Sequence, residues 1–158
     1  MGVSTWLFKT EPDAFSIDDL ARSPKGTTSW NGVRNYQARN LLRDRIQIGD
    51  VVLFYHSSAN PSAIVGLAEV VRAGYPDPTQ FDPRSEYFDA AASDDSPRWY
   101  VVDIRFKEKL ARPLPLDELR GVPALREMML LRRGSRLSVQ PVTAAEWKAI
   151  AALSRKRA

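Results

Sequence analysis

The segment VVLFYH at residues 51–56 constrains the fold more than any other part of the chain. Its first five residues are apolar or aromatic, and successive side chains of a strand point to opposite faces. Both faces of this strand are therefore hydrophobic, and both need cover from other parts of the protein. We expect residues 51–56 to form a central strand of a sheet or of a closed barrel.

Further strands are predicted where aromatic, β-branched and alternating residues gather, at residues 5–10, 63–71, 99–106 and 136–141. In the last two strands we expect Trp99, Ser138 and Gln140 to lie on the polar side. Helices are predicted from capping residues and from apolar residues at helical spacing, at residues 17–21, 36–46, 116–119, 123–133 and 144–151. These predicted strands and helices together correspond to the α+β fold class.

The stretch between residues 73 and 97 is predicted to be a long loop, because prolines and aspartates interrupt every periodic pattern in it. Loops of this length are uncommon inside compact domains and often carry function. This one contains Gln80 and several aromatic residues, which a solvated linker does not need. We expect the loop to contribute to a binding site.

The composition excludes several classes of protein. The 158 residues contain no cysteine and one histidine, His56, so disulfides, thiolate nucleophiles and multi-histidine metal sites are excluded. The length suits a single domain over residues 1–158, and no apolar run is long enough to cross a bilayer. The net charge of +4 permits an acidic partner such as nucleic acid. We expect a monomer in the cytoplasm, with no cofactor, no metal and no membrane partner.

The residues from Ser29 to Arg43 combine an aromatic side chain, a turn, a cation and the start of a helix. Gly32 suits a turn, and a nearby asparagine can cap the helix that follows. Trp30 offers a flat apolar face and Arg34 a guanidinium, neither of which a packing helix requires. The cluster predicts a binding site at the start of this helix.

Catalytic patterns are weak by comparison. The chain has no Gly-x-Ser-x-Gly elbow and no phosphate-binding Gly-x-x-x-x-Gly-Lys run. Adjacent strand residues point to opposite faces, so His56 and Ser57 do not pair if the strand continues through them. The aspartates of the long loop lack the spacing of a calcium site and are better explained as a solvated acidic loop.

The residues fit a pocket for one flipped or single-stranded base, which needs flat walls and a few fixed donors and acceptors. The candidate walls are aromatic: Trp30, Tyr55 and Trp99. The candidate edge contacts are polar: Lys9, Asn35, His56, Ser57, Gln80, Ser138 and Gln140. The candidate phosphate contacts are arginines: Arg34, Arg132, Arg133 and Arg136. Each has an ordinary alternative, as a core aromatic, a satisfied core histidine or a charge at a helix end.

Five motifs in order resemble the EVE domain family: KTEP at 9–12, WNGVRNYQARN at 30–40, FYHS at 54–57, YPDPTQF at 75–81 and RLSVQP at 136–141. The resemblance covers nearly the whole chain. It implies a PUA-like fold, a small mixed β-barrel flanked by helices, related to the YTH domains that read methylated adenine in RNA. It also implies a pocket lined by the segment from Trp30 to Asn35, which includes Val33, together with the strand end at Tyr55–Ser57 and residues near Gln80 and Ser138.

Two functional hypotheses follow from the resemblance and the residues, besides a partner-binding scaffold, which would show an exposed apolar patch instead of a concave basic pocket. The first is a non-catalytic module that binds DNA or RNA through a modified base, with modified cytosine in DNA a leading candidate and a modified RNA base another. The second is an enzyme that acts on a nucleotide or modified base and uses His56 as its acid or base. A reader binds without turnover, whereas an enzyme changes its ligand.

Overall fold

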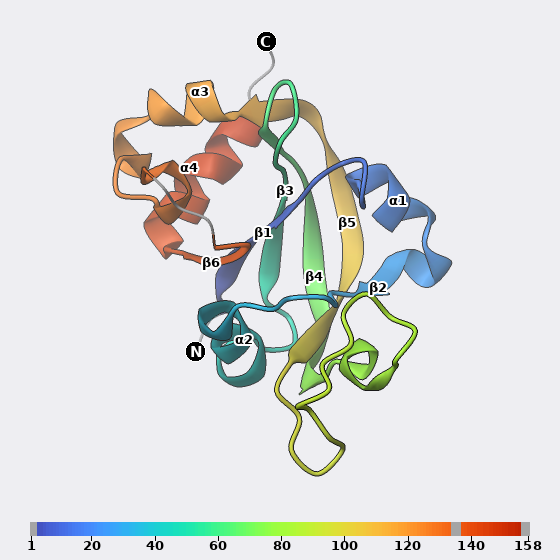
Figure 1. Cartoon of the computed structure of the whole chain (residues 1–158). Helices are drawn as coiled ribbons and strands as arrows, with labels where there is room; N and C mark the ends of the chain where they lie inside the picture. The colour runs from blue at the N-terminus through green and yellow to red at the C-terminus, as the bar shows by residue number, and fades with distance from the viewer. Residues whose placement is uncertain (1–2, 134–136, 156–158) are drawn as a thin grey trace.

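In the part of the chain that the structure describes, six strands form one sheet in the order β2-β5-β4-β3-β1-β6 (Figure 1). The computed structural model describes residues 3–133 and 137–155. The strands are β1 Thr5–Thr10, β2 Thr27–Ser29, β3 Val51–His56, β4 Ala63–Pro76, β5 Tyr100–Pro115 and β6 Val139–Val142. β3 lies inside the sheet, parallel to β1 and antiparallel to β4. The expected central strand is confirmed, because its two apolar faces are covered.

The four α-helices of these described residues are α1 Ile17–Arg22, α2 Tyr36–Asp44, α3 Leu116–Arg120 and α4 Ala144–Ser154. Ser16 with Asp19, and Thr143 with Glu146, form the capping boxes that start α1 and α4. Asn35 caps α2 by accepting a hydrogen bond from the Ala38 N–H. No helix among the described residues is long and apolar enough to cross a membrane.

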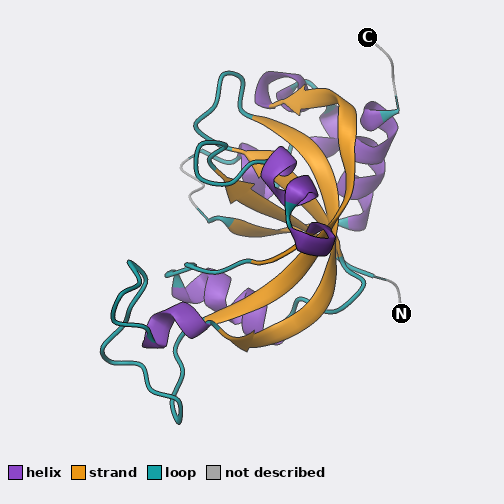
Figure 2. Cartoon of the chain, turned by 90° about the vertical axis from the view of Figure 1, so that its right-hand side faces the viewer, coloured by secondary structure: helices purple, strands orange, loops and turns teal. Residues whose placement is uncertain are grey.

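The two faces of the sheet bury separate hydrophobic clusters. Phe54 on β3 packs with Phe8, Trp30 and the buried sides of α1 and α2. Its neighbours Leu53 and Tyr55 point to the opposite face, where they pack with residues of α3 and α4. The figures show helices on both sides of the strongly curved sheet (Figure 2). Alternation along one strand therefore divides the interior into two cores.

Three predictions about the fold are wrong or incomplete. Among the described residues the edge strands β2 and β6 do not pair, so the sheet stays open and the expected barrel is not closed. β4 and β5 extend to Pro76 and Pro115 because they pair along most of their length, through several irregular registers. The long loop therefore begins at residue 77 and contains the 3₁₀ turn η2 Pro78–Phe81.

The helix predicted at residues 123–133 is also wrong. The chain forms two 3₁₀ turns there, η3 Pro123–Leu125 and η4 Met129–Leu131, separated by an extended Met128. Leu125, Met128 and Leu130 are all buried. An α-helix would rotate residue 130 about 140° away from residue 125, so the broken path is what lets all three side chains face the core. A fourth 3₁₀ turn among the described residues, η1 Pro24–Gly26, links α1 to β2.

Candidate functional site

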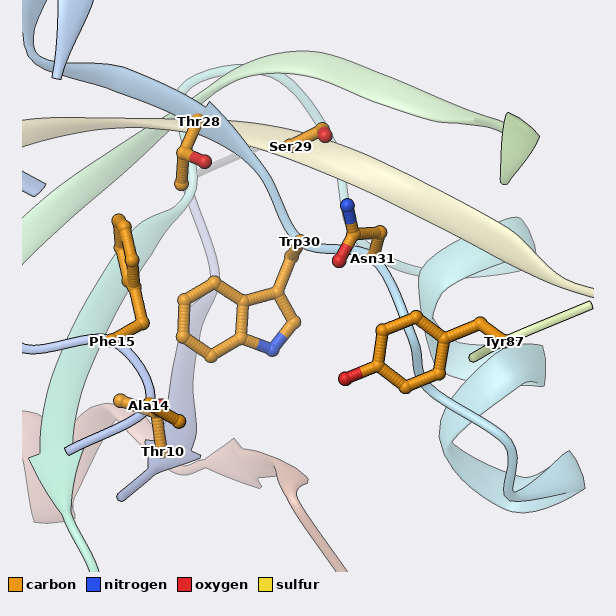
Figure 3. Close-up of a pocket in the computed structure, with 8 residues that line it drawn as sticks. All are labelled: Thr10, Ala14, Phe15, Thr28, Ser29, Trp30, Asn31 and Tyr87. Atoms are coloured by element: carbon orange, nitrogen blue, oxygen red, sulfur yellow. The ribbon is translucent and has the colours of Figure 1, made fainter. Parts of the chain in front are cut away.

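A cavity of about 340 Å³ opens beside Trp30, between the end of β1 and the strand β2. Figure 3 shows the Trp30 indole between Phe15 on one side and Tyr87 on the other. The cavity is lined by Thr10, Ala14, Phe15, Thr28, Ser29, Trp30, Asn31 and Tyr87. Aromatic walls combined with hydroxyl and amide groups suit a flat, partly polar ring.

Trp30 is held rigidly from behind by the core. Its ring centroid lies 5.2 Å from that of Phe8 and 5.7 Å from that of Phe54, the latter in a T-shaped arrangement. Its backbone N–H donates to the Val102 carbonyl at 2.9 Å. Only 9% of the residue is exposed. Trp30 is therefore both a core aromatic and a cavity wall, which joins the two alternatives considered for it.

Tyr87 is a cavity wall that the sequence patterns did not single out. Its ring packs on the backbone of Gly32, where an added Cβ would lie 2.6 Å from the Tyr87 Cζ. Arg34 donates to the Tyr87 carbonyl at 2.7 Å and lies over its ring, 5.4 Å from the centroid. The aromatic content of the long loop was the available signal, but nothing local marked which of its rings would reach the cavity.

Arg34 directs its donors inward. Nη1 donates to the carbonyl of Val33 at 3.0 Å and to Asp77 Oδ2 at 3.1 Å, while Nη2 also donates to Thr79 Oγ1 at 3.2 Å. The carboxylate of Asp77 is fully buried and accepts further hydrogen bonds from Gly32 N and from Thr79. In this arrangement Arg34 joins the start of α2 to the long loop.

Gln80 closes the loop on itself. Its Oε1 accepts hydrogen bonds from the backbone N–H groups of Arg98 and Trp99 at 2.9 and 3.0 Å. Its Nε2 donates to the carbonyls of Asp77 and Trp99, both at 2.8 Å. The side chain is completely buried and does not line the Trp30 cavity.

Three other predicted site residues surround the start of α2. Val33 is buried in the core, and the Asn35 side chain is the helix cap. Trp99 is 6% exposed, which corrects the prediction that it lies on the polar side. Its Nε1 donates to Asp89 at 2.8 Å, and its ring stacks on Tyr36 with centroids 4.9 Å apart. The stack explains why a tryptophan next to polar residues is covered.

The predicted residues at the end of β3 do not line the cavity. Tyr55 packs in the core on the opposite face of the sheet from Trp30. His56 Nε2 accepts a hydrogen bond from the Ile17 N–H at 3.1 Å, at the start of α1. Burial lowers the pKa of His56, since the charged ring is poorly solvated there. The Ser57 N–H donates to the carbonyl of Thr10.

Lys9, Ser138 and Gln140 lie together along the pairing of β1 with β6. The Lys9 N–H donates to the Ser138 carbonyl at 2.8 Å, and burial lowers the pKa of the Lys9 ammonium. Gln140 is 1% exposed and donates to the Leu137 carbonyl at 2.8 Å, so the prediction that it faces outward is wrong. β6 pairs antiparallel with β1, and this pairing places the Gln140 amide in the interior.

The arginines predicted to bind phosphate are scattered. Arg132 and Arg133 are exposed beyond η4, and Arg132 borders a separate cavity of about 260 Å³ with Glu127 and Glu146. Arg136 lies outside the described residues. Among the described residues, Trp30 is the one predicted ligand-binding residue that lines its cavity. Asn31 falls within the predicted segment from Trp30 to Asn35, and Ser29 begins the predicted cluster from Ser29 to Arg43. The lining residues that the sequence did not predict are Thr10, Ala14, Phe15, Thr28 and Tyr87.

The EVE domain model matches residues 4–153. The chain belongs to the EVE domain family. This confirms the resemblance seen in the five motifs. Thymocyte nuclear protein 1 of Homo sapiens is 40% identical to this EVE domain over 171 residues, which cover 97% of the chain and 75% of the human protein.

Solved structures share the fold of this EVE domain along nearly its whole length. A crystal structure of a Pseudomonas syringae protein is 47% identical with a TM-score of 0.89 and covers 96% of this chain and 99% of that one. The human THYN1 protein, crystallised in complex with DNA that contains 5-methylcytosine, is 40% identical with a TM-score of 0.90. That similarity covers 98% of this EVE domain and 99% of the human chain.

Proposed function

We propose that this EVE domain is a non-catalytic module that binds nucleic acid and holds one modified base in the cavity beside Trp30. Modified cytosine in DNA is the first candidate ligand, and a modified RNA base is the second. The observation that carries the proposal is the human relative of the same fold, whose structure contains 5-methylcytosine DNA. We also propose that the protein is a monomer and is located in the cytoplasm.

The chemistry of the cavity supports a base as the ligand. Phe15, Trp30 and Tyr87 supply apolar and aromatic surface for the ring and for a methyl group on it (Figure 3). The Thr28 and Ser29 hydroxyls and the Asn31 amide supply donors and acceptors for its polar edge. A volume of about 340 Å³ lies within the usual range of small-ligand sites.

Extruding a base from a duplex costs a few kcal/mol, and stacking one base on an aromatic side chain returns roughly 1–3 kcal/mol. The base alone therefore gives little net affinity. Contacts with phosphates have to supply the remainder, and the net charge of +4 is of the required sign. Selectivity for the modification and overall affinity thus come from different parts of the surface.

The test is a titration of labelled oligonucleotides carrying unmodified, methylated or hydroxymethylated cytosine, or methylated adenine, as DNA and as RNA. Trp30→Ala is a poor probe because Trp30 belongs to the core. Ala14→Trp is better, since Ala14 is exposed and its new ring would fill the cavity. Ala145→Trp, exposed on α4, is the matched control.

The wild type and Ala145→Trp should prefer one modified base, and Ala14→Trp should lose the preference. Equal preference in the wild type and in Ala14→Trp would overturn the assignment of the cavity. The non-catalytic part has its own test, in which the recovered oligonucleotide is analysed by mass spectrometry after long incubation. A change in its mass would favour an enzyme instead.

A further inference from the structure

Five side chains form a continuous stack that leads from the cavity to the surface. Arg34 lies between two rings, 5.4 Å from the centroid of Tyr87 and 5.3 Å from that of Trp99. Tyr36 stacks on Trp99 with centroids 4.9 Å apart, and the Arg39 guanidinium carbon lies 4.9 Å from the Tyr36 centroid. The inner end of the stack is a cavity wall, and its outer end is a cation.

The outer end is exposed and basic. Tyr36 is 51% exposed although its ring stacks on Trp99 and lies under the Arg39 guanidinium. Arg39 donates to the Arg98 carbonyl at 2.8 Å, and Arg98 Nη1 lies 3.4 Å from the Tyr36 hydroxyl. The ring therefore holds two guanidinium groups on one small area of surface.

These two arginines differ from most others near α2. Within the described residues, neither Arg39 nor Arg98 forms an ion pair with a carboxylate, whereas Arg34 is paired with Asp77 and Arg43 with Asp44. Arg39 also donates from Nε to Asn40 Oδ1 at 2.9 Å, and Asp44 and Asp89 interact with Arg39 and Arg98, respectively, at longer range. Each arginine still retains N–H donors beyond these hydrogen bonds. Guanidinium groups bind phosphate well because their planar donors match its oxygens.

We propose that Arg39 and Arg98, held by Tyr36, bind a backbone phosphate of the nucleic-acid strand that flanks the base in the cavity. The proposal rests on the proposed function for the identity of the partner as nucleic acid. It replaces Arg34 as the phosphate contact, because both Nη groups of Arg34 already donate to Asp77, Thr79 and two carbonyls. In this proposal the phosphate contact that supplies affinity lies next to the cavity that selects the base, and not at Arg132 and Arg133.

The geometry of this site lowers the cost of binding. Arginine side chains lose conformational entropy when a ligand immobilises them. Here the stack on Tyr36 and the hydrogen bond to the Arg98 carbonyl already restrict Arg39 in the free protein. A strand that reaches from the cavity past Tyr87 meets two cations already in position.

The experiment compares Arg39→Gln, Arg98→Gln and the double variant with the wild type, using the same labelled oligonucleotides over a series of salt concentrations. Arg126→Gln is the control, because it removes the same charge from an exposed arginine beside η3. Because both arginines bind the same phosphate, the double variant should reduce the slope of log affinity against log salt by about 0.7–0.9, and each single variant should reduce it by less. Modified and unmodified oligonucleotides should be weakened by the same factor, so the base preference should persist.

Unchanged slopes in both single variants and in the double variant would show that the phosphate does not bind there, whatever the cavity does. If the wild type has no base preference but the slopes still fall, the phosphate site stands and the modified-base proposal is wrong. If the wild type binds no oligonucleotide even at low salt, both proposals are wrong. Circular dichroism of each variant confirms that folding is unchanged.

Discussion

Arg34 and Asp77 form an ion pair of 3.1 Å in which the carboxylate is fully buried and the guanidinium side chain remains 24% exposed. The pair connects the segment before α2 with the long loop, 43 residues later in the chain. Asp77 also accepts from Gly32 N at 2.9 Å and from Thr79 N at 2.8 Å. The buried carboxylate of Asp77 thus holds the turn at Gly32, on which the Tyr87 ring packs, against the start of the long loop.

Removing the charge of Arg34 should destabilise the protein considerably. Arg34→Gln leaves Asp77 buried without its cation, and breaking a buried pair in this way costs about 3 kcal/mol. The free energy of unfolding in urea measures the loss. Adding Asp77→Asn to Arg34→Gln should recover part of it, since the uncompensated charge is then gone. A single variant as stable as the wild type would contradict the importance of the pair.

Gly32→Ala should disturb the cavity through Tyr87. Gly32 has φ +82°, and its Cβ would lie 2.6 Å from the Tyr87 ring, so the substitution strains the backbone and displaces the wall. We expect a loss of about 1–3 kcal/mol from the backbone strain alone, together with a weaker preference for the modified base. Thermal unfolding and the oligonucleotide titration measure the two effects.

The matched control for this variant is Gly121→Ala. Gly121 has a negative φ of −84°, and its nearest neighbour to an added Cβ is the Glu118 carbonyl at 3.5 Å, an ordinary contact. This substitution should change stability little and leave binding intact. If the two alanine variants behave alike, the close packing of Tyr87 on Gly32 does not matter for the site.

His56 should make stability depend on pH. The folded-state pKa of His56 is lowered by burial from 6.5, and its Nε2 accepts the Ile17 N–H only while unprotonated. The unfolded chain therefore binds the proton at a higher pH than the folded protein does. The stability contribution is fully present above about pH 6.5, is lost as the pH falls toward the folded-state pKa, and changes no further below it.

His56→Gln isolates this contribution. The amide oxygen of glutamine can accept the same hydrogen bond but does not titrate in this range. Urea unfolding from pH 8 to pH 5 measures the unfolding free energy of the wild type and of the variant. As the pH falls, the wild type should lose stability relative to His56→Gln. A difference that stays constant with pH would show that His56 titrates alike in the folded and unfolded states.

The sequence predicted those elements that depend on nearby residues. The apolar run at 51–56, the capping boxes of α1 and α4 and the cap of α2 are local patterns, and the structure confirms them. The lengths of β4 and β5 depend instead on pairing between distant segments through irregular registers. The turns η3 and η4 follow from the shape of the core that they cover.

In the candidate site, too, local patterns were predicted correctly and contacts between distant segments were not. Trp30 was predicted from its own motif, and it does line a cavity. Its partners Phe15 and Tyr87 come from two other segments, which only the folded sheet brings together. Asn35 and Gln80 looked like ligand contacts because they are polar and close to the motif, but their side chains bond to the protein's own backbone. Polar residue type alone does not separate these two uses.

Asp50 should be essential to the stability of the β1–β3 pair. Its carboxylate is buried and accepts hydrogen bonds from the Trp6 Nε1 at 2.8 Å, the Ser4 N–H at 3.0 Å and the Gln47 N–H at 2.9 Å. Asp50→Ala leaves three donors without this acceptor, and each buried unsatisfied donor costs about 1–3 kcal/mol. We expect the free energy of unfolding in urea to fall by at least about 3 kcal/mol.

The control for Asp50 is Asp95→Ala, which removes the same charge from an exposed position in the long loop and should leave stability almost unchanged. Asp50→Asn tests the role of the acceptor, because one oxygen is replaced by an amide group that cannot accept from these donors. It should be destabilising although its size matches aspartate. If Asp50→Asn is as stable as the wild type, one carboxylate oxygen is sufficient and the three-donor arrangement is not what holds β1 beside β3.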